Sequence, residues 1–201
     1  MTRFDLYAHV HKALRVLFLE TLAAAGRTDF ENPLELPALA STVRRTARLA
    51  SGHAEHEDRA IHPLLHRHAP ELAADLEAGH DRYEGLERKL EETLVALERA
   101  EPAQRAALGR QLAETLDAYV ADNVTHMRLE ETRANRVLWA HLDDGELIAI
   151  QGQILAGMTP AQIEEMVELM LAAGNARERA ALLTALAAKS NTQVTHVGAG
   201  A

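Results

Sequence analysis

The sequence of 201 residues predicts an all-α protein, in which four long helices form a bundle and shorter helices follow. The composition supports this prediction, because the residues that dominate it (Ala, Leu, Glu and Arg) favour helix. Apolar residues recur with the 3.6-residue period of a helix, and no segment alternates apolar and polar residues as a strand does. Proline or glycine also stands at most of the predicted helix boundaries.

The first predicted helix covers about residues 3–25, and the loop sequence GRTDFENP separates it from the second, at about residues 36–68. Pro63 is expected to kink or end the second helix, because proline lacks the N–H that a helix interior requires. Each helix has an apolar stripe along one side. The stripes consist of Leu6, Val10, Leu14, Leu17 and Thr21 in the first helix, and of Leu39, Val43, Ala50, Ala54, Ile61 and Leu65 in the second.

The third and fourth predicted helices each begin at a proline, which fits the first helical position. Ala69-Pro70 starts the third helix, and Glu101-Pro102 starts the fourth, which is expected to continue to Trp139. Their apolar stripes consist of Leu72, Leu76, Tyr83, Leu90, Leu94 and Leu97, and of Leu108, Leu112, Leu116, Tyr119 and Asn123.

The rest of the chain is expected to be a helical extension. Asp143-Asp144-Gly145 interrupts the fourth helix, which places the bundle in residues 1–144 and the extension in residues 145–190. The extension should contain a short helix at residues 146–156, a second at 160–173 that begins with a capping box, and a third to residue 189. Their apolar sides should pack on the bundle or on a second subunit, as in a homodimer. Residues 191–201 have no periodicity and are expected to form a flexible tail.

Charge and composition argue against several classes of function. The formal net charge is −9 and no basic run is present, which argues against a nucleic-acid partner. The chain has no cysteine, which excludes disulfides, thiolate zinc sites and a cysteine nucleophile. No segment approaches the roughly 20 apolar residues of a membrane span, and the first residues do not resemble a signal peptide. We therefore expect a soluble cytoplasmic protein without a membrane partner.

Four histidines and two glutamates fall on the apolar sides of the four long helices. Two of the helices carry the pattern His-x-x-x-Glu, which places both side chains on one face, one turn apart. Buried imidazoles and carboxylates are costly unless something compensates them, and a metal ion does. The mixture suits iron, manganese or zinc, and two carboxylates able to bridge favour a dinuclear site. The candidate metal ligands are His11, His53, Glu57, His80, His126 and Glu130.

Other side chains compete for this site. His9 is an alternative to His11, although its helix face carries Asp5 and Glu20, which favours His11. His56 faces partly away from Glu57, and we interpret it as a residue that supports the ligands. Tyr83 and Glu84 could also reach a metal. Three further histidines are interpreted as rim or solvent residues, namely His62, His66 and His68.

Four segments that contain these residues resemble the motifs of the hemerythrin-like, or HHE cation-binding, proteins over about residues 5–142. They are HKALR from His11, HAEHEDRAIHPLL from His53, GHDRYEGL around His80, and NVTHMRLEETRANRVLW from Asn123. The resemblance implies an up-down four-helix bundle around two non-haem iron ions joined by an oxide or hydroxide bridge. It also implies that the four histidines named above are terminal ligands and that Glu57 and Glu130 bridge.

The chain departs from the oxygen carriers of that family in two places. Their third helix has a second histidine where this chain has Glu84, and their fourth-helix acid has the spacing of Glu131 rather than Glu130. This six-ligand variant puts simple oxygen carriage in doubt. The resemblance therefore favours a protein that binds O2, peroxide or NO, in oxygen, redox or iron sensing or binding. The alternatives are a di-iron enzyme that removes peroxide or NO, and a metal-free helical interaction protein.

Overall fold

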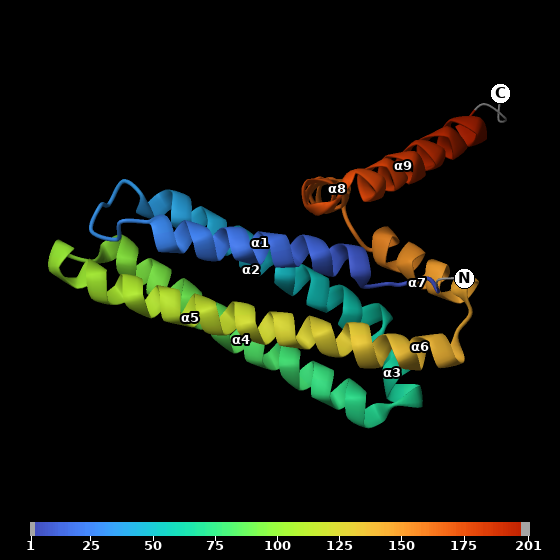
Figure 1. Ribbon diagram of the computed structural model, residues 1–201, viewed down its shortest axis with the longest axis horizontal. Coiled ribbons are helices and arrows are strands. Elements are labelled where there is room, and N and C mark those ends of the chain that lie inside the picture. Colours follow the sequence, from blue (N-terminus) through green and yellow to red (C-terminus); the bar gives the residue numbers. More distant parts are fainter. Residues whose placement is uncertain (1–2, 198–201) are drawn as a thin grey trace.

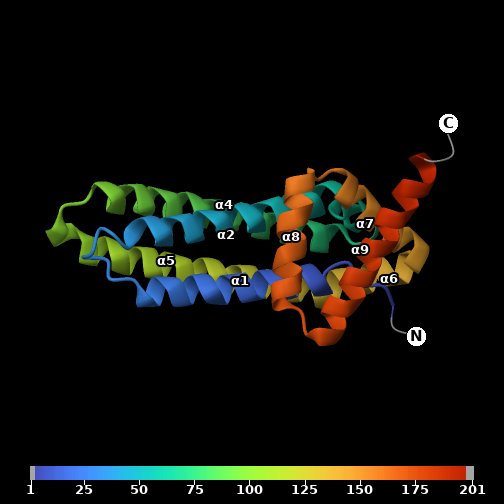
Figure 2. The same ribbon diagram turned by 90° about the horizontal axis from the view of Figure 1, so that it is seen from above.

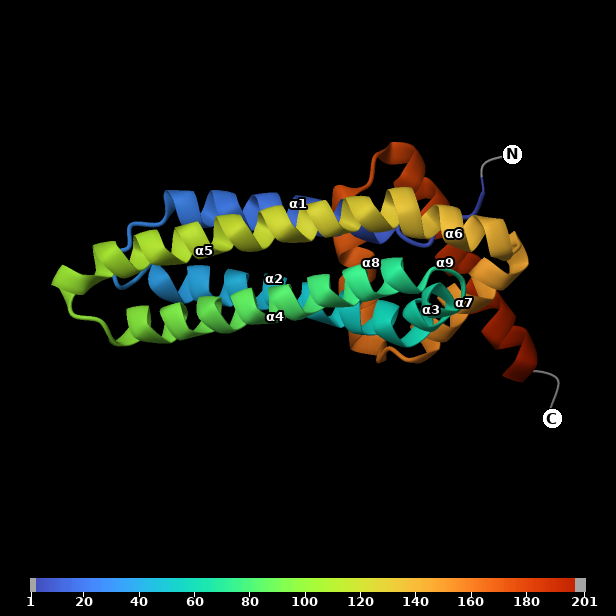
Figure 3. The same ribbon diagram turned by 90° about the horizontal axis from the view of Figure 1, so that it is seen from below.

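The computed structural model describes residues 3–197, with side chains described to residue 187. Four long helices run side by side in up-down order and form an elongated bundle (Figure 1). Short α3, at His62–His68, lies at one end of the bundle, between α2 and α4 along the chain (Figure 3). Within the described part of the chain there is no strand, so the all-α prediction is confirmed. The four long helices are α1 (Ala8–Arg27), α2 (Leu36–Ala60), α4 (Pro70–Arg99) and α5 (Pro102–Leu129).

The core of the bundle consists of two separate apolar clusters, and this division positions the candidate site. One cluster fills the long part of the bundle and includes Leu14, Tyr83 and Met127. The other lies toward the end that carries α3, and includes Leu76 and Ile61. Between the two clusters, each long helix presents polar residues to the interior, so a polar layer crosses an otherwise apolar core.

Two helix boundaries differ from the prediction for local reasons. The first helix begins at Ala8 rather than near residue 3, because the Asp5 carboxylate accepts hydrogen bonds from the backbone N–H groups of Tyr7 and Ala8. The predicted second helix is two helices, α2 and α3, which meet at Ile61. Pro63 causes this break, because it cannot donate a backbone hydrogen bond to the preceding turn.

The predicted fourth helix contains a π-helical segment, Glu130–Ala134, between α5 and α6 (Asn135–His141). A π turn adds a residue to the helix and changes the direction in which the following side chains point, and such turns are frequent at functional sites. It begins at Glu130, one of the candidate ligands. Glu131 is the second residue of the same π turn.

The extension packs on the bundle of its own chain. It consists of α7 (Asp144–Ala156), α8 (Pro160–Ala173) and α9 (Ala176–Val197). Capping boxes begin α7 and α8, as the sequence predicts for α8. Helix α8 lies across α1 and α2 (Figure 2), and its Leu169 is buried against the first apolar cluster.

Charged contacts also attach the extension to the bundle. Glu165 of α8 accepts hydrogen bonds from Arg45 and Arg48 of α2, and Lys12 of α1 pairs with Glu178 of α9. Helix α9 continues to Val197, so it includes part of the segment 191–201 that was expected to be a flexible tail; residues 198–201 lie outside the described residues. None of the described helices is both long and apolar enough to span a membrane.

Candidate metal centre

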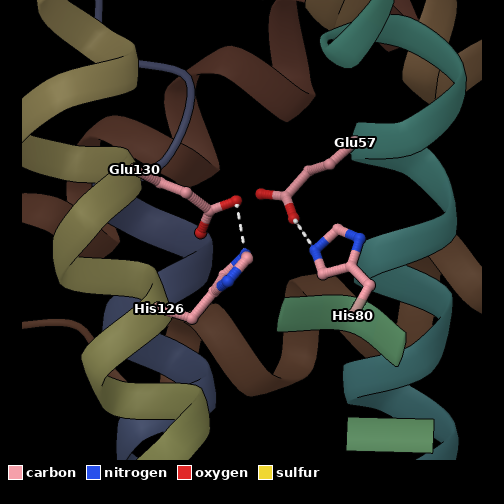
Figure 4. A group of neighbouring side chains, drawn as sticks. All are labelled: Glu57, His80, His126 and Glu130. Carbon is pink, nitrogen blue, oxygen red and sulfur yellow. Dashed lines mark ion pairs between the residues drawn. The ribbon is translucent and has the colours of Figure 1, made fainter. Parts of the chain in front are cut away.

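The structure brings all six sequence-predicted ligands together in the polar layer between the two apolar clusters. His11 comes from α1, while α2 supplies His53 and Glu57. His80 lies on α4, and His126 and Glu130 stand where α5 meets the π turn (Figure 4). The helical periodicity explains this arrangement, since each residue lies one or two turns from apolar residues of both clusters. Their assignment as metal ligands stays a prediction.

On one side of the layer, two imidazoles and a carboxylate oxygen converge. His53 Nε2 lies 2.9 Å from Glu57 Oε1, and His11 Nε2 lies 3.5 Å from the same oxygen. The two imidazole Nε2 atoms are 3.0 Å apart. Two ligand atoms that each lie about 2.1 Å from one ion are separated by roughly 3 to 4 Å, so these three atoms fit a common metal ion.

The other side of the layer repeats this arrangement. His126 Nε2 lies 3.2 Å from Glu130 Oε1, and the rings of His80 and His126 are 4.7 Å apart between centroids. The two carboxylates connect the sides. Glu57 directs Oε1 toward His53 and Oε2 toward His80 Nε2, at 3.7 Å, and Glu130 directs Oε1 toward His126 and Oε2 toward His11 Nε2, at 3.5 Å. Each carboxylate therefore offers one oxygen to each group of histidines.

Several of these atoms are buried without a hydrogen-bond partner. They are Glu57 Oε1, both carboxylate oxygens of Glu130 and His126 Nε2. The short distances from these four atoms to their neighbours do not align as hydrogen bonds, and leaving a buried polar atom unpaired costs about 1–3 kcal/mol. A cation that accepts electron pairs from all of them would remove this cost, so the residues fit bound metal.

The electrostatics of the two carboxylates also favour a cation. Burial acts to raise the pKa of Glu57, but the nearby imidazoles of His53 and His11 outweigh it and hold the pKa well below its ordinary value. For Glu130, burial and the negative charge of Glu57 raise the pKa. The second carboxylate therefore resists ionisation beside the first unless positive charge is added, and a divalent ion adds it.

Two carboxylates outside the layer orient the imidazoles. His11 Nδ1 lies 3.0 Å from Glu131, which in turn accepts two hydrogen bonds from the Arg15 guanidinium. His80 Nδ1 lies 2.8 Å from the carboxylate of Asp58. An imidazole that donates Nδ1–H to a carboxylate presents Nε2 to a metal, which is how proteins commonly fix the ligand tautomer. Glu131, which the sequence left open, thus contacts the candidate ligand His11 from outside the layer. The sequence reading missed Asp58, although it directly follows Glu57 in the motif.

The remaining alternatives also have defined places. Glu84 is exposed and pairs with Arg88, so it lies outside the layer. Tyr83 is buried, and its ring contacts His126 edge-on at 5.1 Å between centroids. The interpretation of His62 as a rim or solvent residue was wrong, because its side chain is buried against the ring of His80. Among the others, His66 and His68 are exposed, and His9 and His56 line a cavity beside the layer.

A second tyrosine, Tyr7, lies against the layer and was not predicted as part of it. Its side chain is 1% exposed, its hydroxyl has no hydrogen-bond partner, and its ring centroid is 5.1 Å from that of His11. Burial and the charges of Glu130 and Glu57 raise its pKa well above the ordinary value, so the hydroxyl keeps its proton. The signal in the sequence was its position one turn before His11 on the same face.

Replacing Gly79 by alanine is expected to disrupt the layer. A Cβ atom at this buried position of α4 would lie 2.4 Å from Nδ1 of His126, closer than van der Waals contact allows, so the imidazole must move. We expect metal affinity to fall at least about tenfold. Gly85→Ala on the same helix is the matched control, because its Cβ meets only the end of Arg88, at 3.9 Å. The control should retain metal and gain about 0.5–1 kcal/mol of stability. Full metal content in Gly79→Ala, measured by elemental analysis, would contradict this account.

The comparisons with known proteins agree with this geometry. The model of the family described as the hemerythrin HHE cation-binding domain matches residues 2–138, which include all six candidate ligands. No curated protein and no solved structure matched the chain. The family match ends before α7, so it covers the bundle and not the C-terminal extension. Because the match covers more than half of the chain, this protein belongs to the hemerythrin HHE cation-binding family.

Proposed function

We propose that this protein is a non-haem di-iron protein that binds O2, peroxide or NO and acts in oxygen, redox or iron sensing or binding. The observation that carries the proposal is the orientation of the two carboxylates. Glu57 and Glu130 each direct one oxygen toward each of two histidine groups, which is the arrangement that two bridged ions require. The proposed ligands are the six sequence-predicted residues, with His11 and His53 at one ion and His80 and His126 at the other.

Iron at this position would supply a reversible change of oxidation state and coordination sites that the protein leaves free. The side chains of the chain itself control what reaches it. Glu131 and Asp58 hold the imidazoles of His11 and His80 in place. The apolar clusters on both sides of the layer limit access of water. The protonated hydroxyl of Tyr7 has no partner in the protein, so it is free to donate a hydrogen bond to a small molecule in the layer.

A cavity of about 120 Å³ connects the candidate centre with the extension. Its size suits a diatomic molecule or peroxide and is too small for a larger organic substrate. From the bundle it is lined by Tyr7, His53 and Glu57, and from the extension by Met158, Met166 and Met170. A small molecule that entered it would contact both the centre and α8, which supports a role in sensing through the C-terminal helices.

The metal content of the purified protein, with an optical spectrum before and after exposure to air, tests the proposal. We expect about two iron ions per chain and near-ultraviolet charge-transfer bands that develop in air. A protein that takes up no iron after anaerobic reconstitution would overturn it. Zinc in place of iron at the same residues would support the geometry of the centre but refute its redox function.

An enzyme that removes peroxide or NO is the second candidate. Glu84 stands where the oxygen carriers have their fifth histidine. Its side chain is 69% exposed, so this position contributes no ligand to the centre, which favours the enzyme. Fewer protein ligands leave the metal more open to small reactants. Turnover of peroxide or NO that exceeds the rate of free iron would favour this candidate, whereas binding without turnover would favour the sensor.

Metal affinity should increase with pH below about pH 9. Burial acts to lower the pKa of His11, but hydrogen bonding to Glu131 and Glu57 outweighs it and raises the pKa to about 9 in the metal-free protein. A metal ion must displace the proton on Nε2, so the apparent affinity should fall about tenfold for each unit of pH below that value. The same proton stabilises the metal-free fold, fully below the ordinary histidine pKa, and this contribution is lost as pH rises through about 9.

Anaerobic titrations with Fe²⁺ at about pH 7 and about pH 8 measure this dependence. Glu131→Gln is the informative variant, because it removes the carboxylate that contributes most to the raised pKa of His11. Its affinity should depend less on pH than that of the wild type. An affinity that is the same at both pH values in the wild type would show that His11 is not a ligand that must lose a proton.

A further inference from the structure

Three methionines lie together in the cavity that connects the candidate centre with the extension, in a chain that has five. They are Met158, in the connection between α7 and α8, and Met166 and Met170 of α8. Met166 and Met170 are one turn apart, on the same face of the helix. Among the described residues of the two apolar clusters, leucine is the commonest, and Met127 is the one fully buried methionine. Thioethers are therefore concentrated where the extension meets the centre.

The opposite wall of this cavity belongs to the candidate centre, and it includes Tyr7, His53 and Glu57. The three methionines are half-buried, whereas Met127 is 3% exposed. The chain has no cysteine, so methionine provides its only sulfur atoms. Peroxide oxidises an accessible thioether to a sulfoxide. Peroxide that enters the cavity therefore meets candidate metal ligands on one wall and oxidisable sulfur on the other.

We propose that Met158, Met166 and Met170 are oxidation sites, through which peroxide that enters the cavity loosens the attachment of α8 to the bundle. The sulfur atom of the thioether attacks one oxygen of hydrogen peroxide, the O–O bond breaks, and the products are methionine sulfoxide and water. The sulfur loses two electrons and the peroxide gains them, so no further reactant takes part. The inference rests on the proposed function only in taking peroxide as the small molecule that enters.

Oxidation at these positions acts on the contact between α8 and the bundle, where α8 crosses α1 and α2 (Figure 2). Met166 and Met170 pack against the first apolar cluster, and Leu169 is the one residue of α8 that is buried. A sulfoxide is polar, so it packs poorly against apolar side chains. The ion pairs that Glu165 makes with two arginines of α2 also hold α8, but those arginines are exposed and such pairs contribute little. Oxidation is therefore expected to release α8.

Treatment of the full-length protein with hydrogen peroxide, with and without its metal, tests this inference by two measurements. Mass spectrometry locates each added oxygen atom, and hydrogen exchange of the α8 amides reports the release of the helix. We expect the three cavity methionines to be oxidised before Met127, and the amides of α8 then to exchange at least about tenfold faster. Methionine sulfoxide reductase, which removes the added oxygen, should restore slow exchange.

Leucine variants separate this effect from general oxidative damage. Leucine has nearly the volume of methionine and forms no sulfoxide, so the triple variant Met158→Leu/Met166→Leu/Met170→Leu should fold and keep slow exchange in α8 after peroxide treatment. Met127→Leu is the matched control, because it makes the same substitution in the first apolar cluster, and it should respond as the wild type does. Met166→Gln/Met170→Gln places polar atoms at the same contact and should release α8 without peroxide.

The metal-free protein keeps this test independent of the proposed function. Faster exchange of α8 in that preparation supports the inference even if the chain proves to hold no iron, which elemental analysis measures separately. Unchanged exchange of α8 after all three sulfur atoms are oxidised, or an equal increase in the triple leucine variant, would overturn the inference. Oxidation of Met127 before the cavity methionines would also overturn it.

Discussion

Replacing Glu57 or Glu130 by alanine is expected to reduce the iron bound at the centre from about two ions per chain to one or none. Each carboxylate is buried and faces both groups of histidines, so in the proposed di-iron centre its removal would take a ligand from both ions at once. The substitution also removes negative charge from the layer, and the histidines supply no negative charge to replace it. The loss should therefore exceed the 10- to 100-fold effect that is typical of residues that only orient a ligand.

Elemental analysis after anaerobic reconstitution measures this effect, and circular dichroism confirms that the variants remain helical. Glu84→Ala is the matched control, because Glu84 follows His80 by one turn but is exposed and pairs with Arg88. The control should bind as much iron as the wild type. Full occupancy in Glu57→Ala, or loss of iron in Glu84→Ala, would show that the assignment of ligands is wrong.

The parts of the fold that depend on local chemistry could be predicted from the sequence. Proline at the starts of α4, α5 and α8 located those boundaries, because its missing N–H and restricted backbone act within one turn. The inward positions of the histidines followed from the helical period alone. The sequence also predicted that the second helix would kink or end at Pro63, and α2 ends close to that residue.

Other features depend on contacts between distant segments, and the sequence does not specify those contacts locally. His62 was interpreted as a rim residue because it stands near a helix end, but α4 covers it and places it against His80. The π turn at Glu130 was also missed, since its sequence, EETRA, is compatible with an ordinary α-helix. Tertiary packing therefore decided the position of His62.

The π turn bears directly on the ambiguity between Glu130 and Glu131. From spacing alone, either could be the inner acid of the fourth helix. In the structure Glu130 is fully buried and faces the histidines, whereas Glu131 reaches His11 Nδ1 and Arg15 from outside the layer. Two adjacent acids thus occupy an inner and an outer position around one imidazole. This arrangement could not be deduced without knowing how α1 packs against α5.

Removing the metal is expected to lower the melting temperature of the protein by roughly 5–10 °C. A ligand that binds only the folded state, at about 100 times its dissociation constant, stabilises that state by about 2.7 kcal/mol. For a chain of this size, each kcal/mol corresponds to about 2–4 °C. The buried atoms of Glu57, Glu130 and His126 that have no partner in the protein are the physical source of the loss, because metal removal leaves them unpaired.

Differential scanning calorimetry with and without a chelator measures the shift. The Glu57→Ala/Glu130→Ala double variant is the control, and its melting temperature should respond to the chelator and to added Fe²⁺ much less than that of the wild type. Glu84→Ala should respond as the wild type does, because its exposed carboxylate lies outside the layer. A wild-type melting temperature that is unchanged by metal removal would mean that water already satisfies the buried carboxylates. The polar layer would then be a hydrated interruption of the core, and the function would have to reside in the extension.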